Sequence, residues 1–535
     1  MILAGAAALL VAMLAGFFAW QKLSVPSRPS VAVLPFANLG GDASQDYFAD
    51  GITEDLITDL TKLSGLDVIA RNSAFAYKDR PAALTDVARD LGVRFIVEGN
   101  VRRTGEQIRV SAQLIDTTTG DNLWANRFDR GMAGVFAVQD EMSREIAKAL
   151  GLQPSAVEAE RMARPPTDNL EAYDYYLRAE QVASTGQRTG QLQALALFDK
   201  AVALDPNFAE AFAADARVAV YVWRSAYDDV LQSALARKRA YEKASRALQL
   251  DPDLSSPYAV LGIVQVVDRR YEEAIASAER AVALGPGDVE AQTALAYVQL
   301  FAGNDAAAAA AAETALKLDP NLSATDRLVT GLVFFFQRDN ARAIESFERV
   351  RKDAPGNGDF IIPLGAAYAR AGRLDEARAV VAEGQRLLEG RSCLAGWRMA
   401  FSHFRDNRDL AFYIDALHEA GLSEWPFGFA GNERDLLKGE EIARLVLGQQ
   451  LQGQVAPRGS PAIMQIGPDG KAAFRSSTQM ITETVFVSGD HLCEQSESVF
   501  GHADCGPVYR RAAAAGEADY AYVNSSKVFY FSLVR

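Results

Sequence analysis

The sequence contains few cysteines and few histidines. Its 535 residues include 3 cysteines and 4 histidines. So few cysteines exclude a disulfide-dense scaffold, and so few histidines leave little material for metal binding or acid–base chemistry near neutral pH. Positive charge is also scarce, because 55 Lys and Arg face 69 Asp and Glu, a net charge of −14. This balance predicts no nucleic-acid partner, since nucleic-acid binding needs many cations to neutralise phosphates.

Familiar catalytic motifs are missing as well. The sequence has no Gly-x-Ser-x-Gly serine motif and no Gly-x4-Gly-Lys phosphate loop. The segment Gly467–Lys471 has the composition of a hairpin turn. We therefore predict no catalytic residues, no cofactor and no metal site. With 49% hydrophobic and 23% charged residues, the chain can bury sizeable cores, and its length suggests about three or four domains.

The first 23 residues are predicted to be a transmembrane helix. Ile2–Trp20 is a run of 19 residues without a charge. At 1.5 Å per residue it would extend about 28 Å, close to the thickness of a bilayer core. Trp20 and Lys22 stand where interfacial anchors are expected. The alternative is the core of a cleaved signal peptide, but no basic residue precedes the run and no clear cleavage site follows it.

The orientation of this span is ambiguous from charge. Lys22 and Arg28 follow the span and no Lys or Arg precedes it. Taken alone, the positive-inside rule would place the body of the protein in the cytoplasm. A chain that starts directly at a span is unusual, which raises the expectation that a longer form carries positive charge upstream of Met1. Residues 24–30 are rich in Pro and Ser and are predicted to be a linker.

Residues 31–153 are predicted to form an α/β domain. A short apolar strand at 30–36 precedes a helical stripe made by Phe48, Ile52, Leu56, Leu60 and Leu63. A second strand at 66–71 and a helix ending at Gly92 follow. Three alternating segments, separated by turns at 104–106 and 117–120, then precede a closing amphipathic helix. The predicted order is β-α-β-α-β-β-β-α.

The motifs AVLPFANLGGDASQDYFADGITEDLITDL, VIARNSAFAYKDR and LGVRFIVEGNVRRTGEQIRVSAQLIDTTTGDNLWANRFD occur here in this order. They resemble the TolB amino-terminal-like (FlgO-type) domain, over residues 30–150. That domain occurs on bacterial envelope proteins and in the extracytoplasmic half of membrane-anchored adenylate cyclases. The resemblance implies a periplasmic role in partner binding or assembly, without catalysis.

Acidic residues of the first long helix raise a second interpretation. Asp46, Asp50, Glu54, Asp55 and Asp59 are spaced so that two pairs are four residues apart on a helix. Such carboxylates could gather a metal ion. We expect instead a solvated helix face whose charges complement the helix N-terminus.

Residues 170–390 contain a repeat. A small or apolar residue recurs after 4 and 7 positions, and a proline follows at position 12, most clearly at Ala274, Ala278, Ala281, Pro286 and at Ala308, Ala312, Ala315, Pro320. Prolines 206, 252, 286, 320 and 355 are 46, 34, 34 and 35 residues apart. A period of 34 is typical of tetratricopeptide repeats, which this segment resembles. The step of 46 predicts a longer helix or an insertion near 218–235, and a sixth unit without proline ends near Gly390.

The tetratricopeptide resemblance implies a solenoid of helix pairs with a concave groove that binds a protein or peptide partner. Several aromatic residues are candidates for lining that groove, although core packing is the alternative for each ring. They are Tyr173, Tyr175, Tyr176, Tyr297, Phe301 and Phe334 to Phe336.

The remaining chain is predicted to be a helical connector, residues 391–454, and a small β-rich module, residues 455–535. Cys493 and Cys505 are 12 residues apart in that module. They are compatible with a disulfide, with two buried thiols, or with a zinc site that includes His491 and His502. Cys393 is expected to be buried in the helical part.

The tail motifs WPFGFAG, GEEIARLVLG, DGK, GDHLCEQ and CGPVYR resemble the tail of the same cyclase-associated proteins. This resemblance implies the Cys493–Cys505 bond, which needs an oxidising compartment, and so favours a periplasmic body. The function expected first is a membrane-anchored periplasmic scaffold. A second hypothesis is the sensory or assembly arm of a class III adenylate cyclase, and an enzyme in the β-rich tail is a third. No segment resembles a cyclase catalytic domain.

Overall fold

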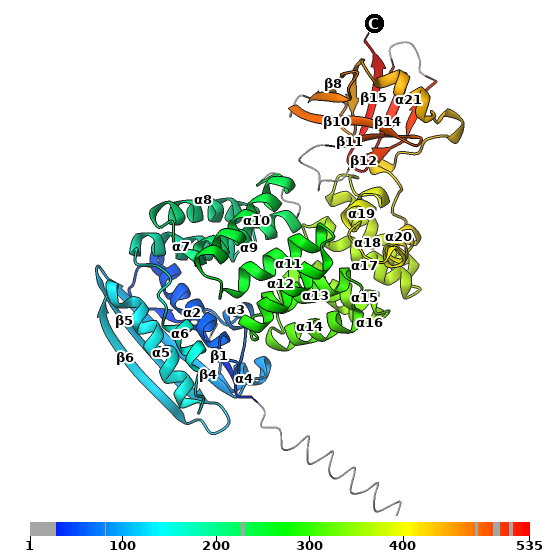
Figure 1. Ribbon diagram of the computed structural model, residues 1–535. Coiled ribbons are helices and arrows are strands. Elements are labelled where there is room, and N and C mark those ends of the chain that lie inside the picture. The colour runs from blue at the N-terminus through cyan, green and yellow to red at the C-terminus, as the bar shows by residue number, and fades with distance from the viewer. Residues whose placement is uncertain are drawn as a thin grey trace, which may run out of the picture. The chain divides into compact units, whose positions relative to one another are not determined.

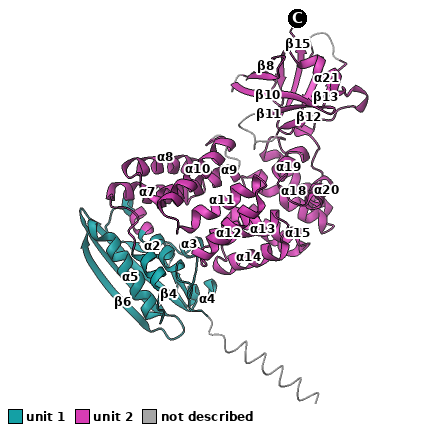
Figure 2. Cartoon of the chain, in the orientation of Figure 1, with its two compact units in different colours: residues 1–45, 52–163 teal, residues 46–51, 164–535 magenta. Residues whose placement is uncertain are grey.

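The computed structural model describes residues 28–80, 82–225, 230–476, 480–495, 503–512 and 517–534. The predicted span Ile2–Trp20 lies outside these residues. Among the helices that are described, none combines the length and the apolar character needed to cross a bilayer. The chain divides into two compact units, residues 1–45 with 52–163 and residues 46–51 with 164–535 (Figure 2).

The N-terminal region contains a six-stranded mixed sheet in the order β3-β1-β4-β5-β6, with β2 paired to β4 (Figure 1). Strand β1 runs parallel to β3 and β4, whereas β4, β5 and β6 form an antiparallel meander. The strands are β1 (Ser30–Val33), β2 (Ala37–Asn38), β3 (Asp67–Val68), β4 (Phe95–Thr104), β5 (Gln107–Asp116) and β6 (Asn122–Gly131). The predicted elements occur in the predicted order, with β2 and short helices in addition.

The helices of this region lie where the apolar periodicity of the sequence predicted them. Helix α4 ends at Gly92, whose left-handed backbone caps it. Ile52, Leu56 and Leu60 of α2 are fully or almost fully buried. The helices are α2 (Asp46–Thr61), α3 (Arg71–Phe75), α4 (Leu84–Leu91), α5 (Val135–Ala149) and α6 (Ala156–Ala163), with single turns η1 (Ala43–Gln45) and η2 (Met132–Gly134).

The acidic residues of α2 have protein partners. Glu54 accepts a hydrogen bond from Arg71 at 3.0 Å, and Asp59 pairs with Lys62 at 2.7 Å. Asp55 accepts a hydrogen bond from the Gln139 side chain at 2.6 Å. The sequence-based metal interpretation therefore has no support at these three carboxylates, because each is already engaged by a neighbouring donor.

Residues 170–387 form helix pairs that stack into a solenoid (Figure 1). The first helices of the pairs are α7 (Leu170–Ala183), α9 (Ala209–Arg224), α11 (Ser255–Val267), α13 (Val289–Phe301), α15 (Ala324–Phe336) and α17 (Gly358–Arg370). The second helices are α8 (Arg188–Leu204), α10 (Ser233–Leu250), α12 (Tyr271–Leu284), α14 (Asp305–Leu318), α16 (Asn340–Asp353) and α18 (Leu374–Leu387). The last pair is the predicted unit without proline.

Small residues set the spacing within each pair. The repeat alanines Ala274, Ala278, Ala281, Ala308, Ala312 and Ala315 of the second helices are fully buried. At Gly331 of α15, a Cβ atom would lie 2.5 Å from the Phe347 ring of α16. Contact this close admits only small side chains on one of the two faces.

Pro286 and Pro320 stand just after α12 and α14, where the helices end. The larger proline step of 46 has a direct cause. Helices α9 and α10 contain 16 and 18 residues, against 13 and 14 in α11 and α12, and additional residues connect α9 to α10.

The segment predicted as a helical connector, residues 391–454, contains helices and turns and also the first residues of a strand that begins at Gln450. It holds α19 (Leu394–Ala400), α20 (Asn407–Glu419), the turns η3 (Pro426–Gly428) and η4 (Glu433–Asp435), and α21 (Gly439–Val446). Helix α20 packs on α17 and extends the solenoid. Ile442 and Val446 of α21 belong instead to the core of the β-rich module.

The β-rich module is an antiparallel sheet with the strand order β12-β11-β10-β9-β8-β7-β15-β14-β13. Strands β12 and β13 are separated only by Pro507, and they pair with β11 and β14 respectively. The sheet therefore closes on itself as an up-and-down barrel. Its strands are β7 (Gln450–Val455), β8 (Ser460–Ile466), β9 (Lys471–Ser476), β10 (Met480–Ser488), β11 (His491–Gln495), β12 (Asp504–Gly506), β13 (Val508–Arg510), β14 (Tyr520–Val523) and β15 (Val528–Leu533).

The predicted start of this module at residue 455 is too late. Strand β7 begins at Gln450, and its sequence QLQGQV is polar at every second position with glycine in the middle. Only Leu451 of this strand points fully into the core. Pairing with β15 and β8, rather than apolar composition, makes this segment a strand.

A disulfide joins Cys493 of β11 to Cys505 of β12, which are direct partners in the sheet. The bond uses both sulfurs, so the free-thiol and zinc alternatives do not apply. His502 lies outside the described residues, and His491 is exposed. Within the described segments, no three His, Cys, Asp or Glu side chains gather as a metal site. Cys393 is a buried free thiol, as expected.

We predict that chains extracted from cells in acid and denatured without reductant react with one equivalent of a maleimide–polyethylene glycol reagent. After reduction they should react with three, because Cys493 and Cys505 become available. A gel-shift assay counts the additions, and a Cys393→Ser variant should show none before reduction. Three additions without reductant would contradict the bond.

Candidate functional site

The concave face of the solenoid is lined by the first helices of the pairs. A chain of charges crosses it from α7 to α13. Arg217 of α9 donates to the buried carboxylate of Glu180 on α7 at 2.6 Å, and its other amino group lies 3.5 Å from Glu290 of α13. The second contact reaches past α11, which indicates that the inner face curves around these side chains.

Several carboxylates on this face lie near one cation, Arg217. Desolvation within the groove raises the pKa of Glu290, and Asp288, Asp326 and Glu180 raise it further, while Arg217 opposes them. The Glu290 side chain is still 47% exposed, so it remains accessible to a partner. This end of the groove is therefore acidic and partly wet.

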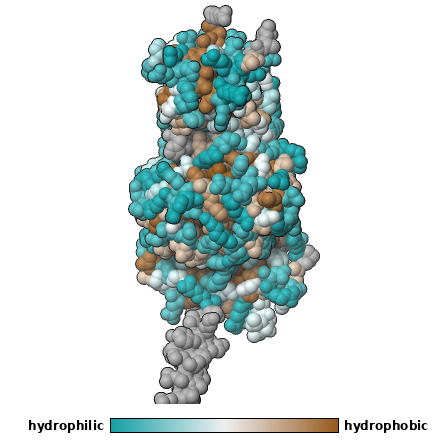
Figure 3. All heavy atoms as spheres, turned by 90° about the vertical axis from the view of Figure 1, so that its right-hand side faces the viewer, coloured by the Kyte–Doolittle hydropathy of each residue, from teal (hydrophilic) through white to brown (hydrophobic). Residues whose placement is uncertain are grey.

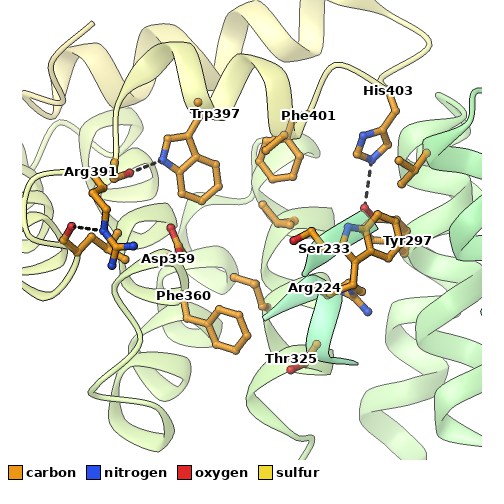
Figure 4. Close-up of a pocket in the computed structure, with 18 of the residues that line it drawn as sticks. Arg224, Ser233, Tyr297, Thr325, Asp359, Phe360, Arg391, Trp397, Phe401 and His403 are labelled. Carbon is orange, nitrogen blue, oxygen red and sulfur yellow. Dashed lines mark hydrogen bonds between the residues drawn. The ribbon is translucent and has the colours of Figure 1, made fainter. Parts of the chain in front are cut away.

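A cavity of about 390 Å³ lies further along the same face (Figure 4). Its floor is formed by the first helices, through Trp223 and Arg224 of α9, Val267 of α11, Tyr297 of α13, Thr325, Leu328 and Leu332 of α15, and Asp359 and Phe360 of α17. Most of these side chains are apolar or aromatic. The few polar groups are therefore well placed to orient whatever enters.

Residues 391–405, which we call the strap, form the opposite wall of this cavity. The strap includes α19 and contributes, among others, Arg391, Trp397, Phe401 and His403 to the lining. In Figure 4, Trp397 and Phe401 extend from the strap toward the floor. The cavity thus exists because a segment beyond the last repeat folds back over the groove.

Backbone hydrogen bonds fix the strap to the solenoid. The Arg405 N–H donates to the Phe301 carbonyl at 2.9 Å, and the Tyr271 hydroxyl donates to the His403 carbonyl at 2.9 Å. The Tyr297 hydroxyl and His403 Nε2 are 3.1 Å apart and share a hydrogen bond. Phe301 packs against Phe404 with ring centroids 4.4 Å apart.

The predicted groove aromatics lie in different places. Of the five main candidates, Tyr297 lines the cavity. Tyr173, Phe301 and Phe334 are buried in the solenoid, and Tyr176 packs between Phe198 and Phe208. For these four, core packing prevails because stacked helix pairs need large apolar side chains between them. Phe335 and Phe336 are likewise buried.

Sequence reasoning missed most of the cavity. Arg224, Thr325, Asp359, Arg391 and Trp397 carry no motif, and they come from segments up to 173 residues apart. The available signal was positional. Glu290, Thr325 and Asp359 each occupy the second position of a first helix, so aligning the repeats would place them in one row.

A second group of polar residues lies inside the barrel. Lys527 contacts the buried carboxylate of Glu494 at 2.9 Å, and Asn524 donates to the same oxygen at 3.0 Å. The other Glu494 oxygen and one oxygen of Glu483 are buried without a hydrogen-bond partner among the described residues. Burial raises the pKa of Glu494 to about 7 against the attraction of Lys527, and Glu483 and Asp504 raise it further.

Comparisons with known proteins agree with the helical part. The tetratricopeptide repeat family matches residues 260–323 and 337–387. These segments are tetratricopeptide repeats. A Rhizobium meliloti (strain 1021) protein named "Putative adenylate cyclase 3" is 42% identical over 254 residues, which is 47% of this chain and 42% of the relative. The chain therefore spans less than half of that relative's length.

Solved structures resemble parts of the chain at low scores. Pseudomonas aeruginosa PilF is 24% identical with a TM-score of 0.29, over 41% of this chain and 93% of PilF. TTC0263 of Thermus thermophilus, a tetratricopeptide repeat protein, is 18% identical with a TM-score of 0.29, over 37% and 98% of the chains. TolB from Acinetobacter baumannii is 21% identical with a TM-score of 0.19, over 23% and 28%.

The raised pKa of Glu494 predicts how barrel stability varies with pH. A carboxyl whose folded pKa is about 7 holds its proton more tightly than in the unfolded chain. Its contribution to the unfolding free energy is therefore complete below about pH 4.3 and is lost as the pH rises to about 7, on the order of 4 kcal/mol in total. Glu494→Gln should flatten this part of the pH profile.

Pulse proteolysis of the full chain in urea at pH 4.5, 6 and 7.5 measures the unfolding free energy of the barrel. Glu440→Gln, at a side chain that is 92% exposed on α21, is the matched control. Equal pH slopes in wild type and Glu494→Gln would show that Glu494 does not hold the raised pKa.

Proposed function

We propose that this protein is a scaffold that binds a protein or peptide partner through the concave face of its repeats. The observation that supports this most directly is the inner face itself, where the accessible Glu290 and its partner Arg217 lie on the same face as a cavity with aromatic walls. Aromatic anchors beside charged groups are the usual makings of an interface hot spot. Tetratricopeptide repeats as a fold present such inner faces to partners.

We also propose that the body is periplasmic and is held to the inner membrane by the segment around Ile2–Trp20. The charge-free run supports the anchor. The Cys493–Cys505 bond supports an oxidising compartment. The N-terminal region would then serve assembly or partner binding, as its FlgO-type resemblance suggests. Labelling of the cysteines in cells, described above, tests the compartment through the redox state of this bond.

A second candidate function is favoured by the Rhizobium relative, whose name contains adenylate cyclase. In this hypothesis the chain is the sensory or assembly arm of a class III cyclase whose catalytic domain is encoded separately or in a longer form. Deletion and overexpression of the protein should then change cellular cyclic AMP in opposite directions. Unchanged cyclic AMP in both strains would exclude this candidate and leave the scaffold proposal intact.

The scaffold proposal predicts that a partner contacts the inner face and not the outer one. A photo-crosslinking amino acid at Glu290, on a first helix, should trap a discrete protein in living cells. The same amino acid at Tyr241, which is 43% exposed on the second helix α10, is the matched control. Adducts are identified by mass spectrometry.

Two results would contradict this use of the inner face. One is the same set of adducts from both positions. The other is a discrete adduct from Tyr241 alone. Charge reversal of Arg217 to Glu should weaken the Glu290 adduct, because it removes the cation that Glu180 and Glu290 share.

A further inference from the structure

The cavity under the strap has the size of a small-molecule site. Its volume of about 390 Å³ falls within the usual range for such sites. The strap closes one side and is fixed by hydrogen bonds from Arg405 and Tyr271. A compact molecule could occupy the cavity while these hydrogen bonds stay in place.

The walls would hold an apolar body. Trp397 and Phe401 of the strap lie across the cavity from Phe360 of the floor (Figure 4). Leu328 and Leu332 also line the cavity. Elsewhere, on the face of the molecule drawn in Figure 3, hydrophilic side chains cover most of the surface and hydrophobic ones form small separate patches.

One half-buried cation that lines the cavity, Arg224, has no carboxylate partner among the residues that the structure describes. Arg224 is half-buried with its guanidinium 4.8 Å from the centre of the Tyr297 ring. Arg391 donates to the Leu388 carbonyl at 3.1 Å. Neither guanidinium has a carboxylate partner in the described part of the chain, and Asp359 is the acidic residue of the lining. Arg224 is therefore a half-buried cation of the described lining without a carboxylate partner, and a monoanion bound beside it would neutralise its charge.

One buried polar atom of the lining also lacks a partner. The Thr325 hydroxyl lies on a residue that is 6% exposed, and no described group of the protein accepts its proton or donates to it. Buried hydroxyls in folded proteins are nearly always hydrogen-bonded. Thr325 lies on the floor of the cavity, so a bound molecule with a polar end could satisfy it.

We propose that this cavity binds a small apolar monocarboxylate, with its hydrocarbon or aromatic body between Trp397 and Phe360 and its carboxylate at Arg224. Arg391 is exposed at the rim and plays a lesser part. This binding is proposed in addition to the scaffold function, and its test on the purified chain can fail independently of the crosslinking at Glu290. The bound carboxylate would contact both the strap and the floor and so hold the strap against the first helices.

The test uses isothermal titration of the purified full chain in buffer free of carboxylates. The probes are 4-phenylbutyrate and octanoate, each with its neutral amide as the charge-free counterpart. Fluorescence of Trp397 and Trp223, which both line the cavity, gives a second readout. We expect each carboxylate to bind at least tenfold more tightly than its amide.

The variants separate charge recognition from folding. Arg224→Gln should bring the carboxylate and its amide to equal affinity, and Arg391→Gln should reduce the difference only a few-fold. Arg386→Gln is the matched control, because Arg386 is exposed near the end of α18 and does not line the cavity. Far-ultraviolet circular dichroism verifies that each variant keeps its helical signal.

Three outcomes would overturn the proposal: no binding of either carboxylate, equal affinity for acid and amide in the wild type, or equal behaviour of Arg224→Gln and Arg386→Gln. Binding of an acetylated Leu-Asp-Phe peptide without binding of the free carboxylates would also overturn it. In that case the cavity would be a side-chain pocket of the peptide groove.

Discussion

The close approach of paired helices is the constraint on which the rest of the solenoid depends. Fully buried alanines along the second helices, and Gly331 against Phe347, bring helix axes together where larger side chains would not fit. No single pair can bury its apolar face alone, so each pair requires the next. The inner face, and every group displayed on it, follows from this stacking.

The strap turns an open groove into a site. Without it, Tyr297, Leu328 and Phe360 would form part of a shallow wall. The aromatic contacts of Phe401 and Phe404 with Phe301 and Phe336 hold it at the ends of the first helices. Phe301 and Phe336, two of the predicted groove aromatics, pack against the strap. Tyr297 lines the cavity, and its hydroxyl shares a hydrogen bond with His403 of the strap.

The barrel is stabilised in a different way from the solenoid. It closes the sheet, so that a small module has no free strand edge between β11 and β14. Inside it, one cation faces the carboxylates of Glu483, Glu494 and Asp504, and burial favours the neutral form of these acids. The disulfide crosses the sheet at the residues next to Glu494 and Asp504 and ties this polar end together.

Periodic features of this protein could be predicted from its sequence, because they depend on neighbours a few residues away. The 34-residue period, the proline helix ends and the alternating strands all repeat at fixed spacing. Features that depend on distant partners could not. Strand β7 is polar in sequence and becomes a strand only through β8 and β15, and the cavity joins Arg224 to Trp397. The sequence by itself determined the helix pairs and the order of strands. Only the tertiary structure decided which aromatics are core and which charges are left unpaired, since burial and pairing arise when segments far apart in the chain meet.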